Sequence, residues 1–377
     1  MYVYNITPDQ HLLLKAAVFP YDEALEYWKK WKTYHNVNDS ILFTEENALT
    51  KVLDSIDRGS HRLLPLVYRN LEASSDVFIQ RLRGLYRHSW MRNQQLLHRT
   101  REIATILNDA GIDTLLLKGM AMSLIHYGDM GARYMNDLDL LVPYEMRDKA
   151  LLVLKASNLR FYINTFDYQM RNYNHALHIY SYEGHNLDLH HHLLFSWRSK
   201  KDDLLFWQKS EPLPSDSGLP CKVLSPTHQF FHSLVHGNFP NIEPDIRWVA
   251  DCYEIYKANE IDWCEIFTLA NRLRLNWPVK QGMRTLIEGY GLTLPAFFQR
   301  DLETLVVDSV EEEYRKFLYD TWHIEKDLRK FYNLARYKYT LYYKDYSQQS
   351  FARWFSELVL TRAIAGAYSS ISPKINS

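Results

Sequence analysis

The segment 115–142 limits the possible folds of this 377-residue chain more than any other stretch. It begins with the apolar run LLLKG, continues with apolar residues at helical spacing and ends with NDLDLLV. Short apolar runs bounded by turn residues are typical of buried strands. The segment therefore predicts a strand, a turn at Gly119, a short helix over 120–127 and a second strand that carries Asp137 and Asp139.

The regions on either side of this segment have the periodicity of helices. Residues 1–95 predict an N-terminal helical region in which Pro65 occupies a first helical turn. Residues 78–108 predict one long amphipathic helix. We assign residues 96–224 to a small α/β core and residues 225–377 to a C-terminal helical domain.

Three more strands are predicted in the central region. Residues 176–182 and 185–190 flank Glu183-Gly184, which is a typical hairpin turn. The run CKVL at 221–224 predicts a final edge strand. The expected fold class is therefore α+β, with a small mixed sheet between N- and C-terminal helical regions.

The composition excludes several classes of protein. The chain has 44 Lys and Arg against 45 Asp and Glu, which argues against a general nucleic-acid binder with its usual basic excess. Its three cysteines form no close pair, so neither a disulfide framework nor a zinc knuckle is expected. We expect a cytoplasmic protein because no secretory signal and no apolar run long enough to span a membrane are present.

The spacing of the acidic residues in the second strand points to a metal site. Side chains alternate along a strand, so Asp137 and Asp139 share one face while Leu138 points into the core. Two carboxylates held so close repel each other unless a cation lies between them, and hard oxygen ligands suit Mg²⁺ or Mn²⁺. Asp188, in the run LDLH, would supply a third carboxylate from another strand.

These three carboxylates, Asp137, Asp139 and Asp188, are the candidate catalytic and metal-binding residues. Two metal ions held between them would support in-line nucleotidyl transfer from a nucleoside triphosphate. An isolated pair of aspartates is weak evidence on its own. The alternative is a solvated strand end or a helix cap for the pair, and a hairpin charge for Asp188.

Three further residues could bind a nucleotide or its phosphates. Backbone N–H groups near Gly119 could receive phosphate oxygens where the helix begins, and Lys118 could add a positive charge. The alternative is a tight turn with the lysine in solvent. Arg133 could also neutralise phosphate. Its alternative role is an ion pair with Asp129 or Asp137 that orders the loop.

Several histidines are also candidates. His190 should share the face of Asp188 and could orient that carboxylate or a nucleotide. His228, His232 and His236 are four residues apart along one helix, which fits either a metal site or a polar helix face beside a cleft. We expect Arg247 and Asp251, also four residues apart, to form a local ion pair. Their alternative role is support of the cleft.

These motifs together resemble a known family. LLLKG, GARYMNDLDLLVP, LDLH, SPTHQFFHSLVH and IRWVADCYEI are similar to the uncharacterised bacterial nucleotidyltransferases of the DNA-polymerase-beta-type superfamily. The resemblance implies a minimal nucleotidyltransferase core inside a helical shell, with metal binding by Asp137, Asp139 and Asp188. It places Lys118-Gly119 where the superfamily usually has a Gly-Ser phosphate loop, with methionine in place of the serine.

The resulting hypothesis is a metal-dependent enzyme that moves an NMP group from an NTP, such as ATP, to an acceptor hydroxyl. The acceptor could be a small molecule, a protein or an RNA end. One alternative is a glycosyltransferase, in which paired aspartates hold a metal-bound nucleotide sugar. Another is a catalytically inactive nucleotide-binding or scaffold protein.

Overall fold

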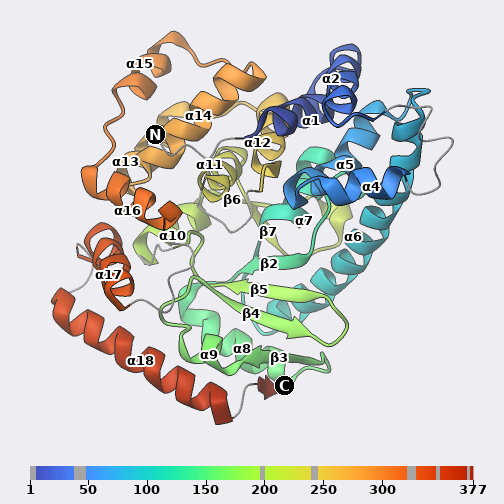
Figure 1. The fold of residues 1–377 in the computed structure, drawn as a ribbon. Helices are drawn as coiled ribbons and strands as arrows, with labels where there is room; N and C mark the ends of the chain where they lie inside the picture. Colours follow the sequence, from blue (N-terminus) through green and yellow to red (C-terminus); the bar gives the residue numbers. More distant parts are fainter. Residues whose placement is uncertain are drawn as a thin grey trace.

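A computed structural model describes the chain over residues 6–37, 48–195, 200–238, 245–320, 328–344, 349–371 and 374–376. The protein is mostly helical, with a mixed sheet in the middle and helices on both flanks (Figure 1). This arrangement confirms the α+β class. No helix among these residues is long and apolar enough to cross a membrane.

The sheet has the strand order β6-β7-β1-β2-β5-β4-β3-β8. Its central pair consists of β2 and β5, which run parallel, while β1 pairs antiparallel with β2 on the other side. The expected strand, helix and strand therefore follow one another, but they do not form a parallel crossover. The strands are β1 (Leu115–Leu116), β2 (Asp137–Leu141), β3 (Phe161–Asn164), β4 (Ala176–Ser181), β5 (Asn186–His190), β6 (Ser210–Pro212), β7 (Lys222–Leu224) and β8 (Lys374–Asn376).

Two of the strand predictions can be compared directly with this order. The predicted hairpin is confirmed, because β4 and β5 pair antiparallel across the Glu183-Gly184 turn. The prediction of an edge strand at 221–224 is wrong in its position. β7 lies between β6 and β1, because the short strand Ser210–Pro212, which has no apolar alternation, covers its outer side.

The N-terminal helices lead to the longest helix of the protein. They are α1 (Pro8–Val18), α2 (Tyr21–Tyr34), α4 (Ala48–Ser55), α5 (Arg58–Leu71) and α6 (Val77–Asp109). The Asp76 side chain caps α6 by accepting hydrogen bonds from the N–H groups of Phe78 and Ile79. Pro65 does not lie in a first turn as expected, because α5 begins at Arg58, capped by Asp57.

The helices after β1 lie within the sheet region and in the C-terminal half. A π-helical turn (Ser123–Tyr127) extends α7, and a short 3-10 turn (Tyr144–Met146) leads into α8. The helices are α7 (Lys118–Met122), α8 (Arg147–Ala156), α9 (Thr165–Gln169), α10 (Lys200–Gln208), α11 (Pro226–Gly237), α12 (Arg247–Ala258), α13 (Trp263–Arg272), α14 (Asn276–Tyr290), α15 (Ala296–Thr304), α16 (Ser309–Asp320), α17 (Leu328–Tyr342) and α18 (Phe351–Ile371).

A single large apolar core joins the two helical flanks. Leu14 of α1, Val67 of α5, Phe230 of α11 and Val249 of α12 are all fully buried in it. A second core lies between the sheet, α6 and α8, and a third lies between α9, α17 and α18. The predicted boundary between the N-terminal region and the α/β core, at residue 95, falls within the uninterrupted helix α6. This boundary stays a prediction.

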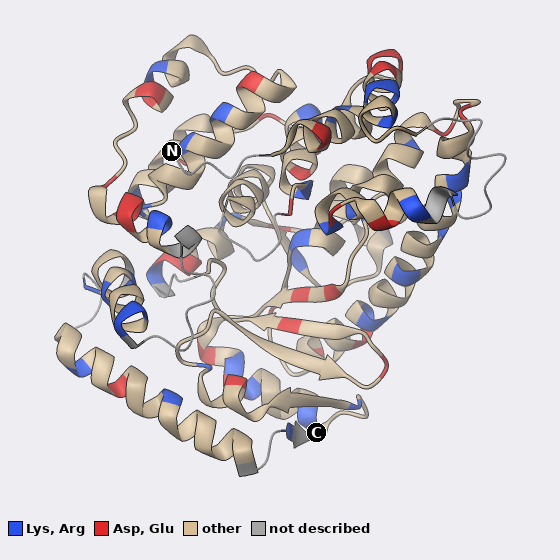
Figure 2. Cartoon of the chain, viewed as in Figure 1, with Lys and Arg blue, Asp and Glu red and all other residues tan. Residues whose placement is uncertain are grey.

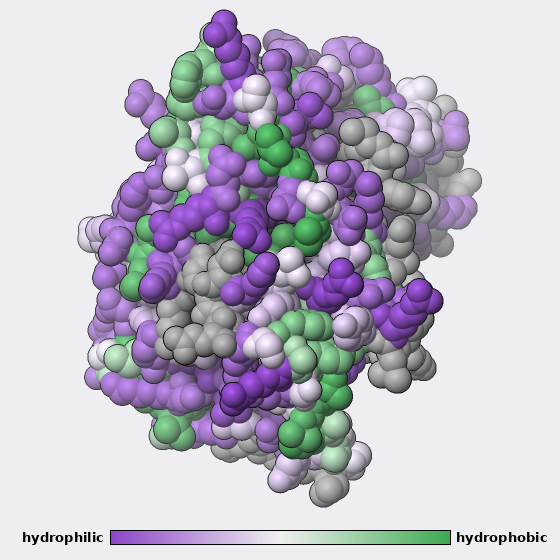
Figure 3. Space-filling view, turned by 90° about the vertical axis from the view of Figure 1, so that its left-hand side faces the viewer, coloured by the Kyte–Doolittle hydropathy of each residue, from purple (hydrophilic) through white to green (hydrophobic). Residues whose placement is uncertain are grey.

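The outer face of α18 leaves several apolar side chains exposed. Val359, Leu360, Ile364 and Tyr368 are between 41% and 61% exposed. Figure 3 shows the side of the molecule that carries α18, where hydrophobic patches interrupt a mostly hydrophilic surface.

Candidate active site

Strand register places the acidic residues of β2 and β5 side by side. Asp139 lies directly opposite Asp188 in the parallel pair, and Asp137 lies opposite Asn186. Figure 2 shows the acidic positions on these two neighbouring strands in red at the middle of the sheet. Residues in register on parallel strands point to the same face. The carboxylates of Asp139 and Asp188 therefore leave the sheet together.

The apolar residues between the aspartates fix this orientation. Leu138 and Leu140 of β2 and Leu187 and Leu189 of β5 are almost fully buried in the core between the sheet and α6. Their burial forces the alternate positions to the opposite face, because the side-chain period of a strand is two. The LDL pattern in both strands thus positions the site.

Asp139 is the most buried of the three candidate carboxylates. Its Oδ1 atom accepts a hydrogen bond from Lys118 Nζ at 2.6 Å and lies 3.0 Å from His190 Nε2. Burial alone would raise the pKa of Asp139, but Lys118 and His190 lower it far below its usual value. His190 lies near Asp188, as expected, but its contact of 3.0 Å is with Asp139, so it is Asp139 that His190 orients.

Asp188 has a different partner. Its Oδ1 atom lies 2.5 Å from Nδ1 of His178, the residue opposite it on β4. Hydrogen bonding to Asp188 raises the pKa of His178, although partial burial opposes this effect. A row of polar side chains thus crosses three adjacent strands, from Asp139 through Asp188 to His178.

Asp137 begins β2 at the edge of the pocket. Loss of solvent around its carboxyl group, followed by the charges of Asp139 and Asp188, raises the pKa of Asp137 to about 6. The residue as a whole still keeps exposed surface. Its raised pKa therefore reflects desolvation first, and then the repulsion among three carboxylates that line one pocket.

The ligand atoms of Asp139, Asp188 and His190 lie within 4.8 Å of one another, so this group could hold a metal ion. Two carboxylates and one imidazole form a donor set that suits Mn²⁺ and, through the oxygens, Mg²⁺. The Oδ1 atom of Asp139 already binds one cationic group in this structure, the ammonium of Lys118. Asp137 is not in that group but lines the same pocket.

The segment that leads into β2 is held by α6. The side-chain amide of Asn93 donates hydrogen bonds to the carbonyl oxygens of Met130 and Arg133, at 2.6 and 2.7 Å. Arg92 donates to the carbonyl oxygens of Met135 and Asn136, at 2.9 and 2.7 Å. Neighbouring residues of one long helix therefore fix the backbone immediately before Asp137.

The Lys118-Gly119 turn is tightly constrained. Lys118 adopts a φ of 45°, in the left-handed region where a non-glycine residue costs about 1 kcal/mol. A Cβ atom on Gly119 would lie 2.6 Å from Arg133 Nη1 and 2.7 Å from Met135 Cγ. Glycine is therefore required here because the loop before β2 packs directly against its backbone.

Arg133 is bound by a residue that lies far away in the sequence. Its Nε and Nη2 atoms donate to the two carboxylate oxygens of Asp251, both at 2.8 Å. Neither Asp129 nor Asp137, the partners considered from sequence, takes that place. The predicted ion pair between Arg247 and Asp251 is not formed, because Arg247 binds Asp245 and Asp251 faces the loop.

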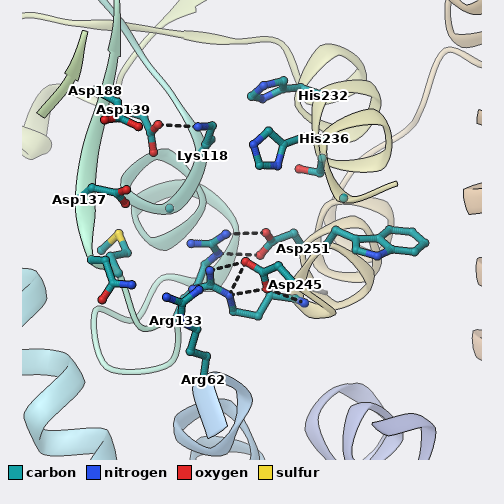
Figure 4. A pocket seen from close by; sticks show the side chains of 17 residues that line it. Arg62, Lys118, Arg133, Asp137, Asp139, Asp188, His232, His236, Asp245 and Asp251 are labelled. Atoms are coloured by element: carbon teal, nitrogen blue, oxygen red, sulfur yellow. Dashed lines mark hydrogen bonds and ion pairs between the residues drawn. The ribbon is translucent and has the colours of Figure 1, made fainter. Parts of the chain in front are cut away.

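These residues line a cavity of about 280 Å³ (Figure 4). The sheet and the loop before β2 form one wall, and α11 and α12 form the other. The lining residues are Arg62, Lys118, Gly119, Arg133, Met135, Asn136, Asp137, Asp139, Asp188, His232, Ser233, His236, Gly237, Asp245, Arg247, Trp248 and Asp251.

The three histidines of α11 separate into two groups. His232 and His236 face the pocket across from Lys118 and Asp139 (Figure 4). Burial, together with the charge of Lys118, lowers the pKa of His236 to about 3, so it is neutral at physiological pH. His228 lies outside the pocket, where its Nε2 atom is 3.1 Å from Oε1 of Glu265. The polar-face interpretation therefore describes His232 and His236.

Comparison with known proteins now gives the family. A family model described as uncharacterised nucleotidyltransferase matches residues 58–289, which is more than half of the chain. The chain belongs to this family. The nucleotidyltransferase match begins at the first residue of α5 and ends within α14, so it includes helices from both flanks as well as the sheet. No curated protein matches the chain significantly.

Sequence reasoning missed several residues that line or support this pocket. Arg62 and Asp245 line it, and Arg92 and Asn93 support it, but none belongs to a recognisable motif. A signal did exist for Asn93, since this polar residue lies within the buried stripe of α6. Arg62 reaches the pocket through contacts between segments that are distant in the sequence, and such contacts leave no comparable pattern in the sequence.

Proposed function

We propose that this protein transfers a nucleoside monophosphate group from an NTP to a hydroxyl group of an acceptor, with Mg²⁺ or Mn²⁺ as the cofactor. The family match supports the nucleotidyltransferase class. The single observation that carries the assignment of the reaction to this pocket is the register of Asp139 with Asp188.

Asp139 and Asp188 would hold the cation, with His190 or Asp137 completing the protein ligands. A divalent cation bound there supplies charge neutralisation for the triphosphate and lowers the pKa of a bound hydroxyl. His190 keeps the Asp139 carboxylate oriented through its 3.0 Å contact. The neighbouring leucines keep both carboxylates on one face.

The charge of the pocket explains the need for a cation. Its lining includes four cationic residues, Arg62, Lys118, Arg133 and Arg247, and five aspartates. A triphosphate is therefore repelled by the empty pocket and attracted once divalent cations are bound. Lys118 can then exchange Asp139 for a phosphate oxygen, because the cation takes over the neutralisation of that carboxylate.

In the proposed reaction, the acceptor oxygen forms a bond to the α-phosphorus, and the bond between that phosphorus and the bridging oxygen of pyrophosphate breaks. The hydroxyl proton is transferred to solvent or to a carboxylate of the site. Catalysis of this kind relies on positioning and charge stabilisation. The rigid loop held by Arg92 and Asn93 supplies the positioning of Asp137.

The glycosyltransferase alternative has less support. Enzymes of that kind usually begin with a parallel β-α-β run that binds the nucleotide. Here β1 and β2 are antiparallel, so the strand before the aspartates does not form such a crossover with theirs.

The direct test uses α-labelled NTPs, Mg²⁺ and three acceptor pools from cells: small molecules, proteins and RNA. Wild type is compared with Asp139→Asn and with the control Asp109→Asn, which removes a charge from an exposed position on α6. We expect labelling of one pool by wild type and the control, but not by Asp139→Asn. Equal labelling by all three proteins would refute the proposal. Nucleotide binding without transfer to any pool would favour a nucleotide-binding scaffold.

A further inference from the structure

Three arginines from separate elements converge on one side of the pocket. Arg62 comes from α5, Arg133 from the loop before β2 and Arg247 from the start of α12. Figure 4 shows Arg62 extending from its helix toward Arg133 and Asp245, below Asp137. Such a concentration of guanidinium groups beside an acidic site requires either counter-charges from the protein or an anionic ligand.

The protein supplies counter-charges for two of the three. Asp251 binds Arg133 through two hydrogen bonds of 2.8 Å. Asp245 binds Arg247, with one hydrogen bond of 2.8 Å from Nε to Oδ1. Among the residues that the structure describes, none forms a hydrogen bond or an ion pair with Arg62. Partial burial and the nearby charge of Arg247 lower the pKa of Arg62, and the charges of Asp245 and Asp137 offset this effect only in part.

Arg62 is held in this position by a well-packed helix. Leu63, Leu64 and Val67 anchor α5 in the main core, and Asp57 caps its first turn with a 3.0 Å hydrogen bond from Ser60 N–H. The arginine itself is half-buried and lies on the pocket side. Its position is therefore set by the fold and not by a local ion pair.

We infer that Arg62 forms an anion subsite that binds a phosphate group at the α5 side of the pocket. The planar guanidinium group binds two phosphate oxygens at once, and Asp137 on the same side places the subsite next to the proposed cation site. The phosphate would be either the terminal phosphate of the NTP or a phosphate carried by the acceptor. The choice between these two sources rests on the proposed function, whereas the subsite itself does not.

The experiment is calorimetric titration of the full chain in Mg²⁺ with a non-hydrolysable NTP analogue, the matching NDP and inorganic pyrophosphate. The variants are Arg62→Gln and Arg62→Lys. Arg58→Gln is the matched control, because it removes the same charge from an exposed position one turn earlier on α5. Thermal unfolding verifies that each variant is folded, and Arg62→Lys provides a milder change if Arg62→Gln does not fold.

If Arg62 binds the terminal phosphate, Arg62→Gln weakens binding of the NTP analogue about tenfold or more and leaves NDP binding unchanged. If it binds a phosphate of the acceptor, both nucleotides bind normally, and pyrophosphate binding to the NDP-loaded protein weakens by a similar factor. Arg58→Gln leaves both nucleotide binding and pyrophosphate binding unchanged. Unchanged binding of all three probes in Arg62→Gln would overturn the subsite.

The same data separate this inference from the proposed function. If wild type binds pyrophosphate but no nucleotide, and Arg62→Gln loses the pyrophosphate, the subsite stands and the nucleotidyl-transfer proposal fails. If wild type binds nucleotides and Arg62→Gln binds every probe equally well, the subsite alone fails. Binding of none of the probes by wild type overturns both.

Discussion

At the scale of single residues, the site depends on the ion pair between Lys118 and Asp139. Both side chains are largely buried, and their closest atoms are 2.6 Å apart. Removing one partner of such a pair leaves an uncompensated buried charge, which costs about 3 kcal/mol or more. Asp139→Asn is therefore expected to lower the free energy of unfolding by about 3 kcal/mol and to abolish nucleotidyl transfer.

A second substitution separates these two effects. Adding Lys118→Met to Asp139→Asn removes the uncompensated ammonium, so we expect most of the lost stability to return while transfer stays absent. Urea unfolding of the wild type, the single variant and the double variant in metal-free buffer measures the first effect. A double variant less stable than Asp139→Asn would show that the uncompensated ammonium group of Lys118 does not destabilise the folded protein.

The raised pKa of Asp137, about 6, predicts how metal binding depends on pH. Below pH 6 the folded protein keeps the proton on Asp137, and a cation must displace it. Cation affinity should therefore rise with pH, by at most about tenfold per unit, and level off above pH 6. Because this pKa is raised above its unfolded value, ionisation of Asp137 destabilises the metal-free fold as pH rises toward 6.

Titration of Mn²⁺ between about pH 5 and pH 7.5 measures this dependence. Asp137→Asn should bind Mn²⁺ more weakly at neutral pH but with a flatter pH profile. The same slope in Asp137→Asn as in wild type would assign the proton to another group of the site.

At the scale of the elements, α6 supports the loop that carries the site. Asn93 is fully buried, and its side-chain amide serves two backbone carbonyls of that loop. Asn93→Ala leaves both carbonyls without this partner, so we expect the free energy of unfolding to fall by about 2 kcal/mol. Transfer activity should fall by a larger fraction than the amount of folded protein. Arg87→Ala, at an exposed position on α6, is the control.

Chemical unfolding and transfer assays on these two variants provide the measurement. Activity of Asn93→Ala equal to that of Arg87→Ala would mean that α6 does not position the loop. The site would then tolerate movement of the backbone before Asp137.

Prediction from sequence succeeded for elements whose signal is local. The alternation of LDLLV and LDLH predicted β2, β5 and the shared face of their aspartates, because a period of two is visible within five residues. β3 and β8 were missed. They are short, and β8 pairs with β3 through Ile375 and Ile163, which lie far apart in the sequence. Pairing over such a distance leaves no periodic signal.

The same distinction holds for the side chains of the site. Asp137, Asp139 and Asp188 were predictable because strand geometry alone sets their direction. The partner of Arg133 was not predictable, because Asp251 lies on a helix more than a hundred residues later and reaches the loop only through tertiary packing. Helical spacing suggested a local pair with Arg247 instead. Local spacing does not indicate which of several partners a packed interior will bring closer.

At the scale of the whole molecule, the helices before and after the sheet share one core. Leu14 of α1 is fully buried in it, and His11 of the same helix lies 2.8 Å from the hydroxyl group of Tyr290 on α14. The N-terminal helices therefore cannot unfold without exposing apolar surface of the C-terminal ones. We expect both flanks to unfold in one cooperative transition.

Leu14→Ala tests this cooperativity, because it opens a cavity in the shared core at a residue that does not line the pocket. Its cost should be about 2–4 kcal/mol. Urea midpoints should be measured by tryptophan fluorescence, to which Trp28 and Trp31 near the N-terminus contribute, by far-UV circular dichroism and by Mn²⁺ binding. All three midpoints should fall to the same lower value. An early fluorescence transition, with metal binding preserved, would show that the N-terminal helices form a separate unit. Arg62 would then belong to a cover that can leave the site.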